Sequence, residues 1–451
     1  MRALDYLQSR AEIDPSRLAV TGISGGGAAT FWIAAADERV KVAVPVSGMS
    51  DLEDYVGGRV VNGHCDCMFC INPFQRSWTD IAALVAPRSL LFANSGHDTI
   101  FPMSGNDRIR ARLERLYGLY TNRTDQVFDI GVTPGGHDDK VELRLMAYRW
   151  INRHLQGQDV PVTEPVLPPF DGAQLRAFPY ALPADERNTS IDQTLLPMAV
   201  RKAWNDAATF SAWRQNTLQE LRRLVFGSVT QPSAINSSEL LPDPQNIGSG
   251  WLPTETGIEI PWRYFPAKNK GPDSGIWLVV LGEAESNESR PEWVNASIGD
   301  AACLVVSPRG SGPLRFQDPP PFFIQRSLPL LGRTLDSCRL IDILHVVGAV
   351  ANSDWGRRRP LKIAGKGAAG ILGAYAGILD TRLTEVIIED PPLSHVSGPI
   401  FPNILRVMDI PDALALLAPR SLMLGSSNPA AFSQTARAYK LTGGTYGILQ
   451  R

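Results

Sequence analysis

The sequence of 451 residues has no long run of apolar residues and no long run of one charge sign. A transmembrane helix needs roughly 18 or more consecutive apolar residues, and no stretch of that kind is present. The 44 Lys and Arg residues balance 46 Asp and Glu residues, for a formal net charge of −2. These absences argue against a membrane and against nucleic acid as partners.

Cysteine is scarce, and a leader sequence is not evident. The five cysteines leave at least one unpaired, and a chain of this length does not need a disulfide framework. The opening segment MRALDYLQSRAEIDPSR is amphipathic, without a charged stretch followed by an apolar one, so we predict no signal peptide there. Because a leader could precede this segment in a longer chain, no compartment is assigned.

Short apolar runs alternate with helical patterns over the first third of the chain. The runs RLAVTG, VKVAVPVSG, RSLLFANSG and QVFDIGV are typical of buried strands, and helical spacing fills the segments between them. Buried strands separated by helices predict a mostly parallel α/β sheet flanked by helices. The alternation returns after about residue 250.

The two halves resemble one unit used twice. The segment from RLAVTGISGGG lines up with PLKIAGKGAAG, and ALVAPRSLLFA (83–93) lines up with ALLAPRSLMLG (415–425). A period this long indicates two related domains rather than stacked repeats. We predict a catalytic domain at 1–156, a proline-rich linker at 157–195 and a second α/β domain at 196–451.

The pentapeptide GISGG at residues 22–26 places one serine between glycines where a strand gives way to a helix. It fits the nucleophile elbow, a sharp turn whose close neighbours must lack a Cβ. In such a turn the Ser24 hydroxyl stands at the carboxyl edge of the sheet, and the Gly25 amide faces a developing oxyanion. A turn that merely joins strand to helix is the alternative, but the flanking pattern favours the elbow.

A serine nucleophile needs an acid and a base, which in this pattern follow the serine in that order. Asp98 leaves one predicted strand in LLFANSGHDTIFP, and His137 follows the next strand in FDIGVTPGGHDD. We predict that His137 accepts the Ser24 proton and that Asp98 orients the imidazole. A loop-capping Asp98 and a simply exposed His137 are the alternatives. Asp138 and Asp139 are further candidates for local electrostatics.

The motifs GISGGG, NGHCDCMFCIN (62–72), LVAPRSLLFANSGHDTIFP and PGGHDD resemble the α/β-hydrolase superfamily, and within it the two-domain carbohydrate esterases of the acetylxylan-esterase type. The resemblance covers residues 15–140 well, and the second half resembles a degenerate hydrolase domain. It implies a triad of Ser24, Asp98 and His137, no cofactor, and allows a secreted or periplasmic location. The expected substrate-lining residues are Ile23, His64, Cys65, Asp66, Cys67 and His97.

The segment from His64 to Cys70 also holds one histidine and three cysteines, which is a composition that suggests zinc. Structural zinc sites draw their ligands from separated segments, and ligands this close do not readily surround one ion. We therefore predict no metal and a loop that borders the substrate, with a Cys65–Cys67 or Cys67–Cys70 thiol pair as an option. Cys65 as a nucleophile is disfavoured because Ser24 occupies the elbow.

The second domain lacks the reactive groups. Gly367 in AGKGAAG stands where the first domain has Ser24, and the position equivalent to Asp98 is Ala430. No histidine follows Ala430 in the sequence. Since glycine has no hydroxyl, we expect a structural or substrate-shaping domain without acyl transfer.

Only 17 residues precede the elbow strand, which is enough for one helix. We expect the first domain to lack the early strands of its sheet, and with them the second oxyanion amide. A preceding segment, a partner chain or the second domain could cover the open edge. An uncovered parallel edge is a liability, so we expect a homo-oligomer or tight domain packing.

The leading hypothesis is a serine esterase that removes small acyl groups, plausibly acetyl groups, from a plant polysaccharide such as xylan. A serine peptidase of the prolyl-oligopeptidase kind shares the fold and the triad order. That family carries a β-propeller, and no period of about 40–50 residues is visible, which favours the esterase. A non-catalytic assembly or carbohydrate-binding protein is the third hypothesis.

Overall fold

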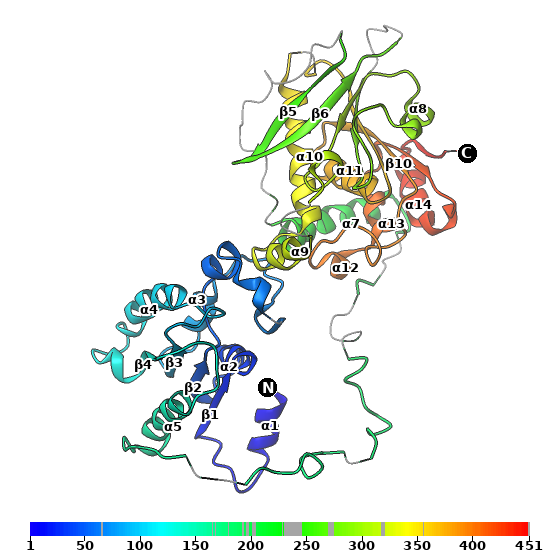
Figure 1. Cartoon of the computed structure of the whole chain (residues 1–451). Helices are drawn as coiled ribbons and strands as arrows, with labels where there is room; N and C mark the ends of the chain where they lie inside the picture. The colour runs from blue at the N-terminus through cyan, green and yellow to red at the C-terminus, as the bar shows by residue number, and fades with distance from the viewer. Residues whose placement is uncertain are drawn as a thin grey trace. The chain divides into compact units, whose positions relative to one another are not determined.

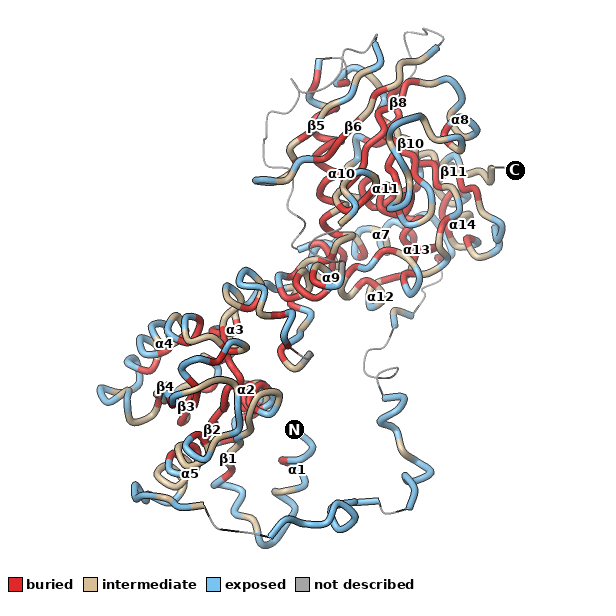
Figure 2. The backbone as a smooth tube through the Cα atoms, in the orientation of Figure 1, coloured by how far each residue is buried: buried red, intermediate tan, exposed pale blue. Residues whose placement is uncertain are grey.

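The computed structural model describes all residues except 65, 165, 167, 179, 192–193, 195–197, 201–203, 228, 230–245, 269–274, 317–320, 355 and 450–451. The chain forms two compact units, Met1–Glu186 and Arg187–Arg451 (Figure 1). The division falls inside the predicted linker 157–195. The described residues of 157–186 are mostly exposed and form no helix or strand (Figure 2). The predicted domain boundaries and roles stay predictions.

The first unit contains a four-stranded parallel sheet in the order β1-β2-β3-β4. All four strands predicted from the apolar runs are present, and the α/β fold class is confirmed. β3 is buried along its whole length, as expected for a parallel sheet covered on both faces. The strands are β1 (Leu18–Ile23), β2 (Val40–Val46), β3 (Ser89–Ser95) and β4 (Phe128–Thr133), and the helices are α1 (Arg2–Gln8), α2 (Gly25–Ala36), α3 (Trp78–Ala83), α4 (Met103–Tyr117) and α5 (Val141–Gln156).

Helices cover both faces of this sheet (Figure 1). Alternate residues of a strand point to opposite faces, so Leu91 packs against Trp150 of α5 on one face. On the other face Phe92 contacts Phe128, whose ring stacks on Tyr117 of α4 with centroids 5.2 Å apart. Three residues at helical spacing on α4 are buried: Ile109, Leu113 and Tyr117. This matches the helical pattern read from the sequence.

The second unit has an eight-stranded sheet in the order β12-β11-β10-β9-β7-β8-β6-β5. β6 pairs antiparallel with β5 and β8, and the other pairs are parallel. The strands are β5 (Gly248–Glu255), β6 (Ile258–Phe265), β7 (Ile276–Val280), β8 (Cys303–Val306), β9 (Leu361–Lys366), β10 (Leu383–Glu389), β11 (Ser421–Gly425) and β12 (Tyr446–Ile448). The helices are α7 (Ala207–Glu220), α8 (Glu292–Ile298), α9 (Pro321–Leu330), α10 (Leu335–Asn352), α11 (Gly367–Leu379), α12 (Ile404–Val407), α13 (Ile410–Ala415) and α14 (Ser433–Thr442).

The repeat seen in the sequence is also present in three dimensions. A helix follows β1 and β9 at the same point, and an arginine in each unit ties the end of that helix to the next strand. Arg88 Nη1 donates to the carbonyls of Asp37 and Val40 at 3.0 and 2.8 Å. Arg420 Nη1 donates to those of Asp380 and Leu383 at 3.3 and 2.9 Å. The two halves that align in sequence therefore also share this local structure.

The two sheets differ at one edge. Among the described residues β1 pairs only with β2, whereas β9 pairs with both β10 and β7. The expected homo-oligomer stays a prediction. No helix in the described part of the chain is both long and apolar enough to cross a membrane.

A buried imidazole lies in the core of the second unit. His395 Nε2 lies 2.7 Å from the Tyr375 hydroxyl, and its Nδ1 lies 2.8 Å from the Pro399 carbonyl oxygen. A carbonyl oxygen can only accept a hydrogen bond, so Nδ1 carries the hydrogen and Nε2 accepts a hydrogen bond from the Tyr375 hydroxyl. Burial holds the pKa of His395 below its ordinary value of 6.5. The folded chain therefore keeps this imidazole neutral.

The lowered pKa of His395 should make the folded chain less stable in mild acid. Above about pH 6.5 the imidazole is neutral in both states, so its full contribution is present. As the pH falls below that value, His395 becomes protonated in the unfolded chain while it stays neutral in the folded chain. The free energy of unfolding therefore decreases. Urea unfolding of the full chain at about pH 7.5 and about pH 5.5 should show a smaller loss in His395→Gln than in the wild type. His97→Gln, which removes an exposed imidazole, should lose as much as the wild type. Equal losses in all three proteins would contradict the assignment.

Candidate active site

Ser24 stands at the junction of β1 and α2 in an unusual backbone conformation. Its φ is 56° and its ψ is −115°, in the left-handed half of the map that favours glycine. Its amide donates to the Val46 carbonyl at 2.9 Å, which holds the turn against β2. A side chain in such a conformation costs on the order of 1–3 kcal/mol and persists only where the surroundings enforce it.

The glycines around Ser24 allow the close approach that the turn requires. A Cβ on Gly22 would lie 2.8 Å from the Gly26 carbonyl carbon, and a Cβ on Gly27 would lie 2.6 Å from the Val46 carbonyl oxygen. Neither position accepts a side chain without moving the backbone. Gly25 is the first residue of α2, so its amide belongs to the positive end of a helix of 12 residues.

His137 and Asp98 converge on the serine from the ends of β4 and β3. His137 Nε2 lies 2.9 Å from Ser24 Oγ, and His137 Nδ1 lies 2.9 Å from Asp98 Oδ2. The other carboxylate oxygen, Oδ1, accepts the amides of Ile100 and Phe101, each at 2.9 Å. The Asp98 side chain is completely buried, and that of His137 is 22% exposed. A hydroxyl, an imidazole and a carboxylate thus form one hydrogen-bonded chain.

Backbone bonds hold the two loops that carry the acid and the imidazole. The Gly96 amide donates to the Thr133 carbonyl at 2.8 Å, and the His97 amide donates to the Gly135 carbonyl at 2.9 Å. The His97 side chain itself is exposed. Its expected place along the substrate stays a prediction, whereas its backbone links the loops.

The loop that carries His64 lies over the elbow. A Cβ built on Gly25 would lie 3.6 Å from the Cβ of Cys67, which belongs to a 3₁₀ helix, Asp66–Met68. The His64 ring is buried, and its Nε2 lies 2.6 Å from the Ile100 carbonyl oxygen. The loop therefore reaches both the elbow and the turn that follows Asp98.

Other predicted residues of the site are placed as follows. Cys65 and the side chain of Asp66 lie outside what the structure describes. Ile23 packs against the apolar cluster beneath the sheet. Cys70 forms no disulfide. Within the described residues no three His, Cys, Asp or Glu side chains are grouped to hold a metal ion.

At the equivalent turn of the second unit, Gly367 occupies the place of Ser24. Its φ of 58° matches the 56° of Ser24, and no atom lies within 4 Å of a Cβ built on it. Ala430, the position aligned with Asp98, lies in a short 3₁₀ helix, Pro429–Phe432. The backbone of the elbow is thus present without its hydroxyl, and without a carboxylate at the aligned position.

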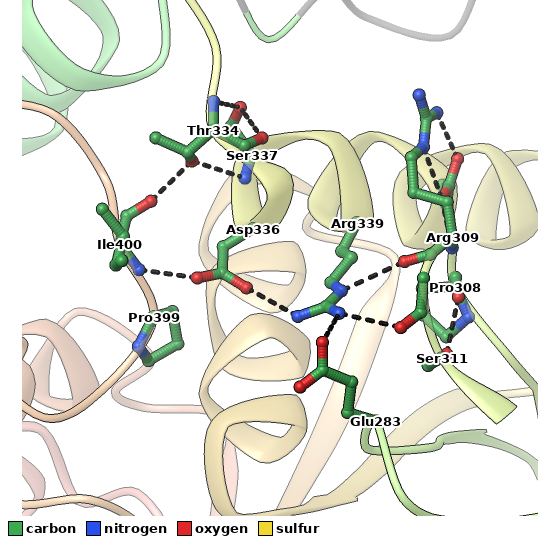
Figure 3. A network of polar contacts seen from close by, with 12 residues as sticks. Glu283, Pro308, Arg309, Ser311, Thr334, Asp336, Ser337, Arg339, Pro399 and Ile400 are labelled. Atoms are coloured by element: carbon green, nitrogen blue, oxygen red, sulfur yellow. Dashed lines mark hydrogen bonds and ion pairs between the residues drawn. The ribbon is translucent and has the colours of Figure 1, made fainter. Parts of the chain in front are cut away.

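Polar side chains at the start of α10 serve internal contacts (Figure 3). Asp336 accepts the Ile400 amide at 2.7 Å and pairs with Arg339 at 3.2 Å. Arg339 in turn pairs with Glu283 at 2.9 Å and donates to the Arg309 carbonyl at 3.1 Å. The segments that follow β7, β8 and β10 are thereby fixed to one helix.

Two contacts of the site were not evident from the sequence. Phe101 lies with its ring centroid 5.7 Å from that of His137, and its amide binds Asp98. Arg144 of α5 pairs with Asp139, two residues after His137, at 2.9 Å, and also with Glu164. Phe101 was visible only as part of the motif around Asp98. A partner for Asp139 carried no local signal because the contact depends on how α5 packs.

The match to a protein family lies within the first unit. Residues 1–157 match the model of the prolyl oligopeptidase family. The Bacillus subtilis protein "Putative hydrolase YtaP" is 28% identical over 156 residues, which are 34% of this chain and 52% of that one. The chain thus spans about half the length of this relative. The match confirms the resemblance of residues 1–157 to the α/β-hydrolase superfamily.

Solved structures are similar to part of this chain. One from Bacteroides fragilis, described as a "putative acetyl xylan esterase", has a TM-score of 0.44 and 12% identity over 58% of this chain and 80% of that chain. Acetyl xylan esterase 1 from Thermoanaerobacterium sp. has a TM-score of 0.33 and 15% identity over 53% of this chain and 85% of that chain.

The packing around the elbow predicts that a methyl group on Gly22 is far more costly than one on Gly26. The Gly22 Cβ would collide with backbone, which typically costs about 1–3 kcal/mol. A Cβ on the exposed Gly26 meets no atom within 4 Å, and alanine favours a helix. Urea unfolding should show Gly22→Ala destabilised by that amount and Gly26→Ala unchanged or slightly stabilised. The packing account fails if both variants unfold at the same urea concentration.

Proposed function

We propose that the first unit is a serine esterase that acts through an acyl-enzyme on small esters, with acetyl groups on a plant polysaccharide such as xylan as its substrates. The observation that carries the proposal is the chain of hydrogen bonds from Ser24 Oγ through His137 to the buried Asp98. This arrangement of nucleophile, base and orienting acid is the one that acyl transfer requires.

Each residue has a definite role in this mechanism. Asp98 fixes the tautomer of His137 with the proton on Nδ1, so that Nε2 accepts the Ser24 proton as Oγ attacks the ester carbonyl carbon. The Gly25 amide, at the helix start, stabilises the oxyanion of the tetrahedral intermediate. The protonated His137 then gives its proton to the departing alcohol. Water, deprotonated by His137, attacks the acyl-enzyme and releases the carboxylic acid and free Ser24.

The choice of an ester over a peptide follows the sequence resemblance to carbohydrate esterases. The family match favours one competing function, a serine peptidase of the prolyl oligopeptidase type. Both use the same triad, so the geometry of Ser24 and His137 supports either one. The substrate must decide between them.

Ester hydrolysis should depend on Ser24 and on Asp98 to different degrees. With p-nitrophenyl acetate, Ser24→Ala should lower kcat to the background of the buffer, because no nucleophile remains. Asp98→Asn should lower kcat by about 10³–10⁴, since the amide leaves His137 in the wrong tautomer. Ser9→Ala, which removes an exposed hydroxyl just after α1, should retain wild-type kcat. Hydrolysis by Ser24→Ala at the wild-type rate would exclude the serine mechanism.

An organophosphonate should label one serine, the one at position 24. Digestion and mass spectrometry should locate the added mass on the peptide that contains Ser24 in the wild type and on no peptide in Ser24→Ala. Parallel assays with p-nitrophenyl acetate and a proline-containing peptide then separate the two functions. Cleavage of the peptide at a higher kcat/KM than the acetate would replace the esterase with the peptidase.

A further inference from the structure

We propose that Cys67 limits the length of the acyl group that the Ser24 site accepts; this inference rests on the proposed function. The 3₁₀ helix Asp66–Met68 packs against the start of α2, and the Cys67 Cβ lies 3.6 Å from where a Cβ of Gly25 would stand. Gly25 carries the amide assigned to the oxyanion. Cys67 is therefore a side chain that lies beside the residue assigned to the oxyanion.

The loop that holds Cys67 is fixed on both sides. Met68 is completely buried, and the His64 ring packs edge-on against Tyr55 and Phe101, with centroids 4.5 and 4.6 Å apart. His64 Nε2 also lies 2.6 Å from the Ile100 carbonyl oxygen. A side chain on such a support keeps its position when a substrate presses on it.

The same contacts tie the loop to the acid of the triad. The amides of Ile100 and Phe101 bind Asp98 Oδ1, and the Ile100 carbonyl and the Phe101 ring both contact His64. The segment 98–101 thus contacts both His64, three residues before Cys67, and the acid of the triad. The loop of Cys67 and the acid of the triad therefore contact the same short segment.

This geometry selects short acyl chains. In this proposal, an ester whose carbonyl oxygen binds the Gly25 amide and whose carbonyl carbon meets Ser24 Oγ directs its acyl chain past Gly25 toward Cys67. A methyl group fits there, whereas further methylene groups meet the thiol. Each methylene that a pocket accepts or rejects changes kcat/KM by about 10-fold or more.

Two substitutions of opposite size test the inference. The probes are p-nitrophenyl acetate, butyrate and hexanoate, and the readout is the ratio of kcat/KM for butyrate to that for acetate. Cys67→Ala should raise this ratio by about 10-fold, and Cys67→Leu should lower it by a similar factor. Cys70→Ala, which removes a neighbouring thiol outside the 3₁₀ helix, should leave the ratio at the wild-type value.

Other outcomes are equally informative. An unchanged ratio in both Cys67 variants, or a shift in the same direction in both, overturns the inference. A series of acetates with alcohols of increasing size tests the other side: selectivity that follows the alcohol and not the acyl chain also overturns it. Organophosphonate labelling of Ser24 in each variant confirms an intact fold and triad. Because the wild type must first hydrolyse acetate and Ser24→Ala must not, failure of the proposed function is detected separately.

Discussion

The positive φ of Ser24 is the constraint on which the rest of the first unit depends. A serine in this conformation is strained. The conformation is held by the hydrogen bond from the Ser24 amide to the Val46 carbonyl and by the close backbone contacts of Gly22 and Gly27. Relaxation of the turn would point the hydroxyl away from His137. The four-stranded sheet and α2 therefore hold Ser24 in a backbone conformation that a serine would otherwise rarely adopt.

In the second unit the equivalent turn carries a glycine in place of the serine. Gly367 adopts nearly the same φ as Ser24, but glycine reaches it at no steric cost. Other polar groups there, such as Asp336 and Arg339, pair with each other and with backbone atoms. The fold therefore does not need the strained serine in order to form. The strain in the first unit is explained by what the hydroxyl at position 24 can do.

Those features of the fold and site that follow from local sequence could be predicted, and those that depend on packing could not. Strands β1 to β4 follow from short apolar runs, and the positions of Ser24, Asp98 and His137 follow from their place at strand ends. The contact of Cys67 with the elbow joins segments some 40 residues apart and has no periodic signature. The same holds for the ring of Phe101 beside His137.

The burial of Asp98 explains why these unpredicted contacts matter. A carboxylate without access to water must have its charge balanced by hydrogen bonds, and Asp98 has them from the Ile100 and Phe101 amides and from His137. The two amides belong to the turn that His64 contacts through the Ile100 carbonyl and the Phe101 ring. A shift of the His64 loop would thus disturb the turn that solvates the acid. Two successive peptide units therefore link the loop that carries His64 to Asp98, the residue that orients the base.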